Sequence, residues 1–236
     1  MKKKILIFII TYKAKFRILK VYQQLPLREL KKYKINILIS DDASRDETIK
    51  YIKKIKNRIV IKTFNKKNLG YGGNIKKCLK YAKQKKYDYA IMLHGDGQYH
   101  PKYLPFMLSK FRDNEVYAVT GSRMINRKNA LLGKMPFYKF VGNIFLTFLT
   151  NVITKKKFTD CHSGFWAYRL SMFNKIKLSK ITDSFNFDQQ VRLSCIQNSL
   201  KISEIPIKTI YGSERSSIHL VYAIRYVFEL FKYIIK

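Results

Sequence analysis

Two side chains that carry hard oxygen atoms, Asp96 and Gln98, lie two residues apart on a turn that contains glycines. Side chains alternate along an extended strand end, so both can point the same way. Carboxylate and amide oxygens suit Mg²⁺ or Mn²⁺, and such an ion keeps positions for a diphosphate leaving group. An ordinary Gly-Asp-Gly turn is the alternative. We interpret the pair as a metal site because polar clusters also follow the neighbouring apolar runs.

A second pair of acids, Asp41 and Asp42, directly follows an apolar run. A carboxylate at this point can accept hydrogen bonds from a nucleobase edge or a ribose hydroxyl. Either Ser44 or Asp46 can cap the helix that follows. Capping does not explain why a second acid stands at the end of the apolar run. We therefore expect Asp41 and Asp42 to contact a nucleoside.

The segment 68–74 contains three glycines and precedes a helical run. At Gly72, Gly73 and Asn74 the backbone can approach a ligand closely, and the helix N-terminus can face negative charge. The segment lacks the Gly-Lys-Ser/Thr ending of a P-loop, and it does not follow G-x-G-x-x-G. A flexible turn is the alternative, so this segment alone does not decide between the two.

Three charged residues in the second half of the chain complete the candidates. Arg123 follows an apolar run and could hold a phosphate through two parallel hydrogen bonds. Asp160 could act as a general base toward an acceptor, and Asp188 is a rival for that role. Each carboxylate could equally cap a helix or pair with one of the many cations.

The elements that must position these residues alternate in type. Short apolar runs predict buried strands at 5–10, 36–40, 58–64, 89–94 and 116–120. Stretches of helical length lie at 14–33, 46–56, 73–86 and 102–112. This order predicts an α/β fold with a mostly parallel central sheet flanked by helices. Ligands of such sheets bind beyond the carboxyl ends of the strands, where the polar clusters fall.

Length and charge limit the classes that remain. The 236 residues fit one domain, and 47% hydrophobic residues are enough for a packed core. Lys and Arg number 48 against 15 Asp and Glu, a formal charge of +33 that favours anionic partners. The abundance of Lys, Ile, Asn, Tyr and Phe is also what an AT-rich genome produces without any functional cause.

Cysteine usage and apolar runs indicate the compartment. The three cysteines are scattered, with no C-x-x-C pair, which argues against a disulfide framework or structural zinc and favours a reducing compartment. The start resembles a signal peptide, but its apolar run of six residues is short and no small-residue cleavage site follows. The longest uncharged run, 140–154, is shorter than a transmembrane helix.

Six motifs in order carry a family resemblance. They are Asp-Asp-Ala-Ser-Arg-Asp (41–46), Asn-Leu-Gly-Tyr-Gly-Gly-Asn (68–74), Gly-Asp-Gly-Gln (95–98), Gly-Ser-Arg (121–123), Asp-x-x-Ser-Gly-Phe (160–165) and Glu-Ile-Pro-Ile (204–207). The set resembles family 2 glycosyltransferases, in the subgroup of dolichyl-phosphate mannose synthases and other polyprenyl-phosphate sugar transferases. The resemblance extends over residues 1–217 and implies a GT-A fold with inverting transfer from a nucleotide sugar.

The resemblance implies roles for individual positions. Donor binding would involve Thr11, Tyr12, Asp41, Asp42, Gly72, Gly73, Asn74, Asp96 and Arg123. Asp96 and Gln98 would hold Mg²⁺ or Mn²⁺ on the diphosphate, and Asp160 and Asp188 would border the acceptor. The segment 211–217 would cover the site, with Arg215 and Ser216 as phosphate contacts.

Two departures from the family pattern leave the donor open. The family has Asp-x-Asp-Gly where this chain reads His94-Gly-Asp-Gly, so an acid that contacts ribose or metal-bound water is replaced. The N-terminal Pro-x-Tyr-Asn-Glu reads Ile-Thr-Tyr-Lys-Ala at 10–14, which removes an acid near the nucleoside. Neither change alters the implied class of reaction.

Two segments have amphipathic helical patterns. In 140–154, four polar residues recur at spacings of four, three and four, and the remainder is apolar. The last helix, expected from about 217 to 236, shows the same spacing of charged residues. Both could lie in a membrane interface with cations toward anionic headgroups. Packing onto the sheet or a homo-oligomer contact is the alternative. We expect a catalytic domain over 1–217 and this helix at 218–236 as part of the same unit or as a docking element.

The hypothesis is therefore a metal-dependent glycosyltransferase at the cytoplasmic face of a membrane, with a polyprenyl phosphate as acceptor. A transferase that extends a cell-surface glycan is the first alternative, and a non-catalytic relative that binds a nucleotide sugar is the second. The charge and 14% aromatic residues would also suit nucleic acid. We exclude that partner because the acids gathered at one rim would repel a phosphate backbone, and no nucleic-acid motif is recognised.

Overall fold

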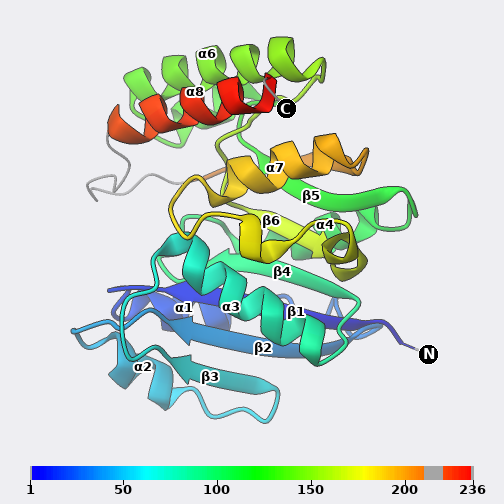
Figure 1. Cartoon of the computed structure of the whole chain (residues 1–236). Coiled ribbons are helices and arrows are strands. Elements are labelled where there is room, and N and C mark those ends of the chain that lie inside the picture. The colour runs from blue at the N-terminus through cyan, green and yellow to red at the C-terminus, as the bar shows by residue number, and fades with distance from the viewer. Residues whose placement is uncertain (1, 210–219, 235–236) are drawn as a thin grey trace.

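The computed structural model describes residues 2–209 and 220–234. Its strands are β1 (Lys4–Thr11), β2 (Lys34–Asp41), β3 (Val60–Phe64), β4 (Tyr89–His94), β5 (Val116–Ser122), β6 (Trp166–Arg169) and β7 (Lys201–Pro206). Its α-helices are α1 (Arg17–Gln23), α2 (Thr48–Lys54), α3 (Tyr71–Gln84), α4 (Leu104–Lys110), α5 (Arg127–Leu132), α6 (Phe137–Thr154), α7 (Phe187–Gln197) and α8 (Leu220–Ile234). Short 3₁₀ helices are η1 (Pro101–Tyr103), η2 (Leu170–Asn174) and η3 (Leu178–Lys180). Figure 1 shows their arrangement.

The strands form one seven-stranded sheet in the order β3-β2-β1-β4-β6-β5-β7. β1 pairs in parallel with β2 and β4. β6 is antiparallel to both β4 and β5, so β4 and β5 run in the same direction. The carboxyl ends of β1, β2, β4 and β5 therefore share one edge, which confirms the predicted α/β class with a mostly parallel sheet.

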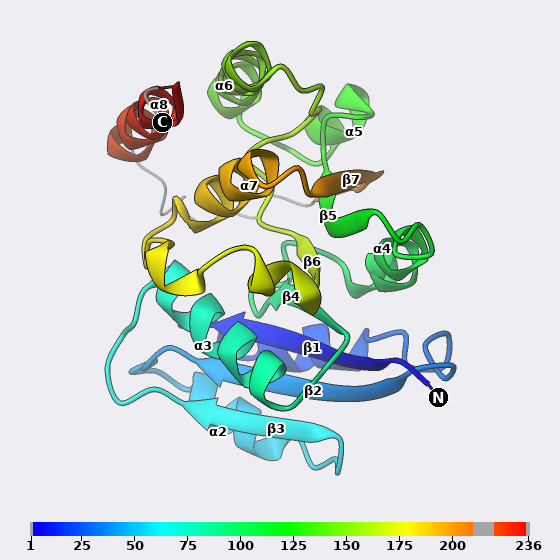
Figure 2. The same cartoon turned by 45° about the vertical axis from the view of Figure 1, so that its right-hand side comes forward.

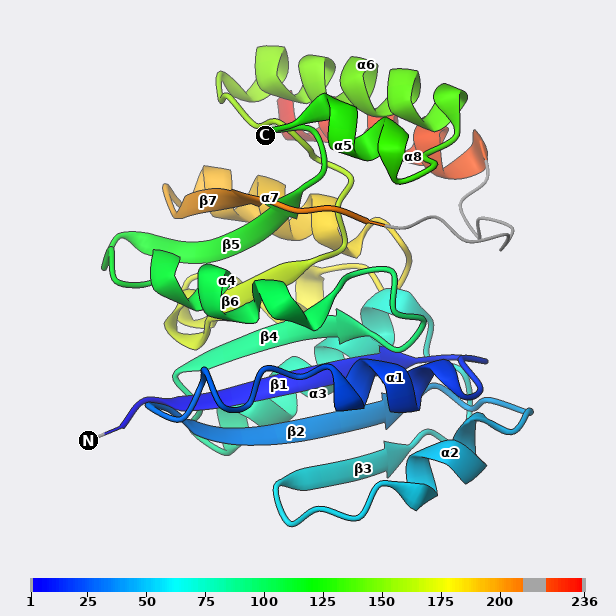
Figure 3. The same ribbon diagram turned by 180° about the vertical axis from the view of Figure 1, so that it is seen from behind.

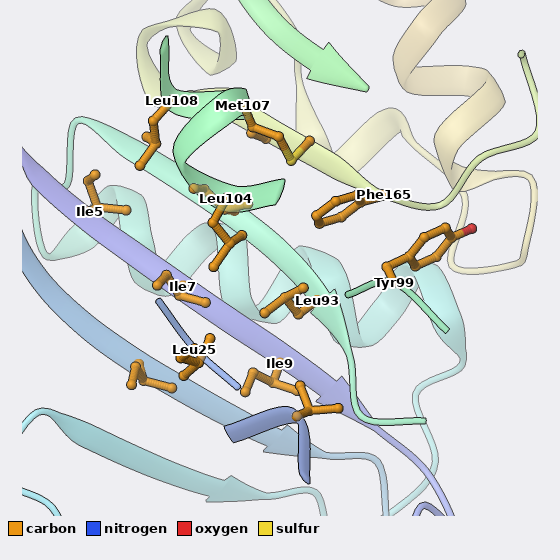
Figure 4. Packing of buried hydrophobic residues seen from close by; sticks show 14 of the residues in the cluster. Ile5, Ile7, Ile9, Leu25, Leu93, Tyr99, Leu104, Met107, Leu108 and Phe165 are labelled. Carbon is orange, nitrogen blue, oxygen red and sulfur yellow. The ribbon is translucent and has the colours of Figure 1, made fainter. Parts of the chain in front are cut away.

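Helices cover both faces of the sheet. β1 is apolar and buried on both sides, as expected for a central parallel strand. Ile5, Ile7 and Ile9 face the layer of α1, α2 and α4 and share a hydrophobic cluster with Leu104 and Met107 of α4 (Figures 3 and 4). The alternate side chains of β1 join a second cluster with α3 and α7 on the opposite face. This packing fixes the strand ends and the loops that follow them.

The five predicted strands are confirmed, although β3 begins two residues later than expected and β5 ends two residues later. The helix expected over 14–33 is wrong beyond Gln23, where turns lead to β2. Pro26 explains the stop, because proline disfavours helical backbone at the residue before it and has no N–H to donate. β6 and β7 were not predicted, since each is short and not apolar throughout.

α6 and α8 lie side by side at one end of the sheet, above α7 (Figures 1 and 2). The Thr150 and Tyr226 hydroxyls join them at 2.8 Å. The predicted helix over 140–154 is therefore confirmed, and it begins three residues earlier, after Pro136. Among the described residues, no helix combines the length and apolar character needed to span a bilayer.

Candidate functional site

The last residues of four parallel strands define the rim of the site. Thr11, Asp41, His94 and Ser122 end β1, β2, β4 and β5, and all lie at the same edge of the sheet. The first three are neighbours across the ladder, since Thr11 pairs with Asp41 and Ile10 pairs with His94. The topology therefore brings together segments that the sequence separates by as many as 111 residues.

Asp41 stabilises the turn that follows β2. Its carboxylate accepts hydrogen bonds from the Ser44 N–H at 2.9 Å and the Ser44 hydroxyl at 2.6 Å. Burial raises the pKa of Asp41, and the bonds from Ser44 oppose that rise. Ala43 between them adopts a positive φ of 59°. Beside this turn, half of the Tyr12 surface is exposed at the end of β1, while Thr11 is buried.

Asp42 has a structural role in this conformation. Its Oδ1 accepts hydrogen bonds from Asn65 Nδ2 and the Leu69 N–H, both at 2.8 Å. These bonds fasten the loop after β3 to the end of β2. Both bonds go to Oδ1, and the expected contact of Asp42 with the donor stays a prediction.

The glycine-rich segment does not form a phosphate cradle. The Gly72 and Gly73 N–H groups donate to the Asp183 carbonyl at 2.8 and 3.2 Å. A Cβ on Gly72 would lie 2.6 Å from the Thr182 carbonyl oxygen, so the glycine allows α3 to approach that segment. Asn74 is buried and joins its side chain to Ser40 on β2. The three residues thus secure the start of α3, and their expected contacts with the donor stay a prediction.

Asp96 lies exposed on the turn after β4, with Gly97 at a φ of 79°. Its Oδ1 accepts the Gln98 N–H at 2.9 Å. Gly95 lets this turn approach β1, because a Cβ there would lie 2.7 Å from both Thr11 Cβ and Thr11 Oγ1. The turn therefore carries a carboxylate at the open rim and fixes it against two central strands.

The donor set suits a divalent ion that is shared with a ligand. Among the described residues, no cluster of three or more His, Cys, Asp or Glu side chains could hold a metal by itself. One carboxylate, Asp96, and one amide, Gln98, leave the remaining positions to water and phosphate oxygens. Mg²⁺ and Mn²⁺ are commonly bound in this way, through few protein ligands and a substrate diphosphate.

His94 occupies the place where the resemblance expects an acid. Its ring packs edge-on against Tyr71 and Tyr99 at centroid distances of 5.7 and 5.1 Å. Burial lowers the pKa of His94 and so favours the neutral imidazole, although the Asp96 charge opposes this. Its Nε2 is buried and has no hydrogen-bond partner within the described ranges. An aromatic cluster, and not an additional carboxylate, therefore surrounds the strand end.

Asp188 lies in the first turn of α7, beside this aromatic cluster. The Tyr71 hydroxyl donates to its Oδ2 at 2.7 Å, and the Tyr71 ring stacks on Phe185 at 5.4 Å. Burial raises the pKa of Asp188 to about 7, while the Tyr71 bond and the Arg192 charge act in the opposite direction. A carboxyl group with this pKa can exchange protons near neutral pH, as a general base must.

Arg123 and Asp160 form a buried ion pair. Arg123 Nε and Nη2 donate to Asp160 Oδ2 and Oδ1 at 2.7 and 2.9 Å. The Arg123 N–H also donates to Oδ2, at 3.1 Å. Burial alone would raise the pKa of Asp160, but the charge and hydrogen bonds of Arg123 outweigh it and hold that pKa well below its usual range. Asp160 therefore stays a carboxylate and is a poor general base.

Two residues that sequence analysis did not assign to the site support this pair. Asn143 Nδ2 on α6 donates to Asp160 Oδ1 at 2.9 Å. Arg192 on α7 is fully buried between Phe158 and Trp166, with its guanidinium 4.6 and 5.0 Å from their ring centroids. Its Nη2 donates to the Asp160 carbonyl at 3.3 Å. Asn143 was visible only as part of a polar helical stripe, and nothing in the sequence marked Arg192.

The structure thus brings six of the predicted residues to one edge, as two polar groups. One contains Thr11, Asp41, Asp96 and Gln98 at the ends of β1, β2 and β4. The other contains Arg123 and Asp160, after β5 and before β6. The predicted phosphate contacts Arg215 and Ser216 lie outside the described residues. The first group can hold a metal-bound diphosphate, and the second brings a guanidinium to the same rim.

Comparison with known proteins gives a consistent result. Residues 6–177 match the sequence model of the glycosyl transferase family 2. An uncharacterized protein of Methanocaldococcus jannaschii is 33% identical over 187 residues, which cover 78% of this chain and 74% of that relative. The UDP-N-acetylglucosamine–dolichyl-phosphate N-acetylglucosaminyltransferase of Methanococcus voltae is 30% identical over 190 residues, covering 75% of each chain.

Solved structures agree on the fold. Glucosyl-3-phosphoglycerate synthase from Mycobacterium tuberculosis, in complex with Mn²⁺, uridine diphosphate and phosphoglyceric acid, superposes with a TM-score of 0.71. The superposition covers 98% of this chain and 78% of that one, at 12% sequence identity. At this identity the similarity shows a common GT-A architecture.

Proposed function

Because the chain belongs to glycosyl transferase family 2, we propose that it transfers a sugar from a nucleoside diphosphate donor to a polyprenyl phosphate. The dolichyl-phosphate acceptor in the name of the Methanococcus voltae relative supports this acceptor class.

The observation that carries the proposal is the state of Asp160. An alcohol acceptor needs a base to remove its proton, and Asp160 is bound to Arg123 with a pKa held well below its usual range. A phosphate monoester loses its second proton near pH 6, so its oxygen is already a nucleophile at neutral pH. Such an acceptor needs a cation to orient it, and Arg123, which is bonded to Asp160, would take that role.

The same arrangement suits a single displacement. The phosphate oxygen would attack the anomeric carbon on the face opposite the diphosphate, which inverts that centre. Asp96 and Gln98 would bind a divalent ion, which neutralises charge on the departing nucleoside diphosphate. The Mn²⁺ and uridine diphosphate in the Mycobacterium tuberculosis structures support a divalent ion for this fold. Thr11, Tyr12 and Asp41 would face the nucleoside.

The lipid acceptor implies the place of action. A polyprenyl chain stays in the bilayer, so the enzyme would work as a peripheral protein at the cytoplasmic membrane face. The three cysteines, which are buried free thiols, are compatible with a reducing compartment.

A glycan hydroxyl is the second candidate acceptor, and Asp188 favours it. Burial raises the pKa of this carboxyl to about 7, which suits a general base. A hydroxyl acceptor needs a general base to remove its proton, whereas a phosphate acceptor does not. Asp188→Asn should reduce turnover with a hydroxyl acceptor by at least about a hundredfold, since base catalysis contributes 10²–10⁴-fold. With polyprenyl phosphate, the same change should reduce turnover less than about tenfold.

Nucleoside diphosphate release tests the proposal. The protein is incubated with Mn²⁺ or Mg²⁺, a panel of nucleotide sugars, and a short polyprenyl phosphate or an oligosaccharide. We expect release that requires the lipid phosphate and disappears in Asp96→Ala, while Asp113→Ala, which removes an exposed acid paired with Lys201, stays active. Release that requires only the oligosaccharide would replace the proposed acceptor, and release that survives in Asp96→Ala would refute the proposed metal site.

A further inference from the structure

α6 packs against the protein with its polar side. The residues that it buries all have polar side chains: Asn143, Thr147, Thr150 and Thr154. Its large exposed residues are apolar or aromatic: Phe137, Tyr138, Val141, Phe145, Phe148 and Val152. Phe145 and Phe148 expose 61% and 63% of their surface, which is the reverse of an ordinary surface helix.

α3 of the same chain shows the ordinary arrangement. It buries Ile75, Cys78, Leu79 and Ala82 against the sheet and exposes Lys80 and Lys83. The composition bias of the chain therefore does not explain α6, because the same lysine-rich background places charges outside α3. Specific contacts hold the inverted face of α6, including Asn143 to Asp160 and Thr150 to Tyr226.

The neighbouring helices also expose apolar residues. α8 lies beside α6 and exposes Ile224, Phe228, Phe231 and Ile234, each by more than half of its surface. α5 precedes α6 and exposes Leu131 and Leu132, the latter by 80%. We call these exposed residues of α5, α6 and α8 the apolar face. Figures 2 and 3 show the three helices together at one end of the molecule.

Exposed cations accompany the apolar face. They are Lys134 before α6, Lys155, Lys156 and Lys157 directly after it, and Arg225 and Lys232 on α8. Glu229 is the acid that α8 carries among its described residues, and it contacts Gln190 and Lys232. Aromatic and aliphatic residues with cations among them are the composition of helices that lie in a membrane interface.

We propose that the apolar face docks onto an anionic lipid bilayer, an inference that rests on the proposed lipid acceptor for its role in the reaction. A second copy of the chain would bring the same cations against each other, and each chain has a formal charge of +33. Anionic headgroups complement that charge instead. Docking through α6 would bring Arg123 close to the bilayer surface, since Asn143 on this helix contacts its partner Asp160.

Vesicle sedimentation without donor or acceptor tests the docking. The full chain should bind phosphatidylglycerol vesicles at least about tenfold more tightly than phosphatidylcholine vesicles, and less tightly at high salt. Phe145→Ser combined with Phe148→Ser and Phe228→Ser should weaken the binding at least about tenfold. Phe106→Ser is the matched control, because Phe106 exposes 60% of its surface on α4, outside the apolar face. Circular dichroism checks that each variant is folded.

Three results would overturn the inference. These are failure of the wild type to bind anionic vesicles, equal binding by the triple variant, and equal loss in Phe106→Ser. A wild-type dimer that the triple variant converts to a monomer in sedimentation velocity would assign the face to a second copy and also refute it. Because the assay contains no sugar donor, failure of the proposed transferase reaction leaves the binding result intact. Conversely, transfer to a detergent-solubilised acceptor without vesicle binding would refute docking alone.

Discussion

Asn143 Nδ2 lies 2.9 Å from Asp160 Oδ1, so a helix whose outer side is apolar contacts the charged pair of the site. The same Oδ1 accepts hydrogen bonds from Arg123 Nη2 at 2.9 Å and from the His162 N–H at 3.0 Å. Asp160 is thus held from three segments: the end of β5, the helix α6 and the turn before β6. Its position, and that of Arg123, depends on how α6 is seated.

Replacing Asn143 with leucine should impair use of the acceptor. The substitution removes one hydrogen bond to a buried carboxylate, which is worth about 1.5–3 kcal/mol. We expect kcat/KM for the lipid acceptor to fall about tenfold to a hundredfold, while the KM for the nucleotide sugar stays within about twofold. Steady-state kinetics with each substrate varied in turn measures the difference.

Thr154→Val is the control for that variant. Thr154 lies on the same buried face at the far end of α6, and its hydroxyl donates to the Thr150 carbonyl. Removal of this hydroxyl should lower the free energy of unfolding without a selective effect on kcat/KM for the lipid acceptor. Equal kinetics for both variants, or a parallel loss for donor and acceptor in Asn143→Leu, would show that Asn143 acts through stability alone.

The Arg123–Asp160 pair should be more costly to break than to replace. Arg123→Gln leaves the Asp160 carboxylate buried without its cation, which should lower the free energy of unfolding by about 3–5 kcal/mol. Arg123→Met combined with Asp160→Leu should recover part of that loss, because it removes both charges. Urea unfolding of the single and double variants tests this. A double variant that is less stable than Arg123→Gln would contradict it.

The parallel sheet could be predicted because its central strands carry their own pattern. β1 and β4 are apolar runs that end at polar residues, and this is sufficient to locate a buried strand and its carboxyl end. Asp96 and Gln98 were predicted from that end and the glycines around it. β6 and β7 were missed because their residues become strand only through pairing, β6 with β4 and β5, and β7 with β5.

The contacts within the site could not be predicted in the same way. The bond from the Gly72 N–H to the Asp183 carbonyl joins residues 111 positions apart, and no local pattern encodes it. The polar stripe of α6 could be recognised in the sequence. The pattern alone does not show whether the polar or the apolar face of the helix is buried. Only packing shows that Asn143 points inward, where Asp160 and Tyr226 bring polar partners to the stripe.

The raised pKa of Asp188 predicts a dependence of stability on pH. Burial raises this pKa from 3.8 to about 7, so the folded state binds a proton that the unfolded state releases. The contribution of Asp188 to stability is therefore lost as pH rises from about 4 to about 7. Asp188→Asn does not titrate, so its stability relative to wild type should improve between pH 5 and pH 8.

Asp113→Asn provides a control of opposite sign. The hydrogen bond from Lys201 lowers the pKa of Asp113, so its contribution is present at neutral pH and is lost as pH falls. This variant should therefore lose stability relative to wild type at pH 8 and approach it at low pH. Chemical denaturation at several pH values measures both. A constant difference between Asp188→Asn and wild type over pH 5–8 would show that the pKa of Asp188 is not raised.

Gly95 should be essential for the position of Asp96. A methyl group there would lie 2.7 Å from Thr11 Cβ and Thr11 Oγ1, so Gly95→Ala must separate the ends of β1 and β4. A displacement of about 1 Å near reacting groups can cost a hundredfold in rate, and we expect a loss of that order.

Gly142→Ala on α6 is the matched control. A Cβ there meets no heavy atom of the described residues within 4 Å, so alanine should add up to about 1 kcal/mol of helix stability without loss of turnover. Nucleoside diphosphate release and thermal melts measure both variants, and full activity in Gly95→Ala would show that the turn tolerates the displacement.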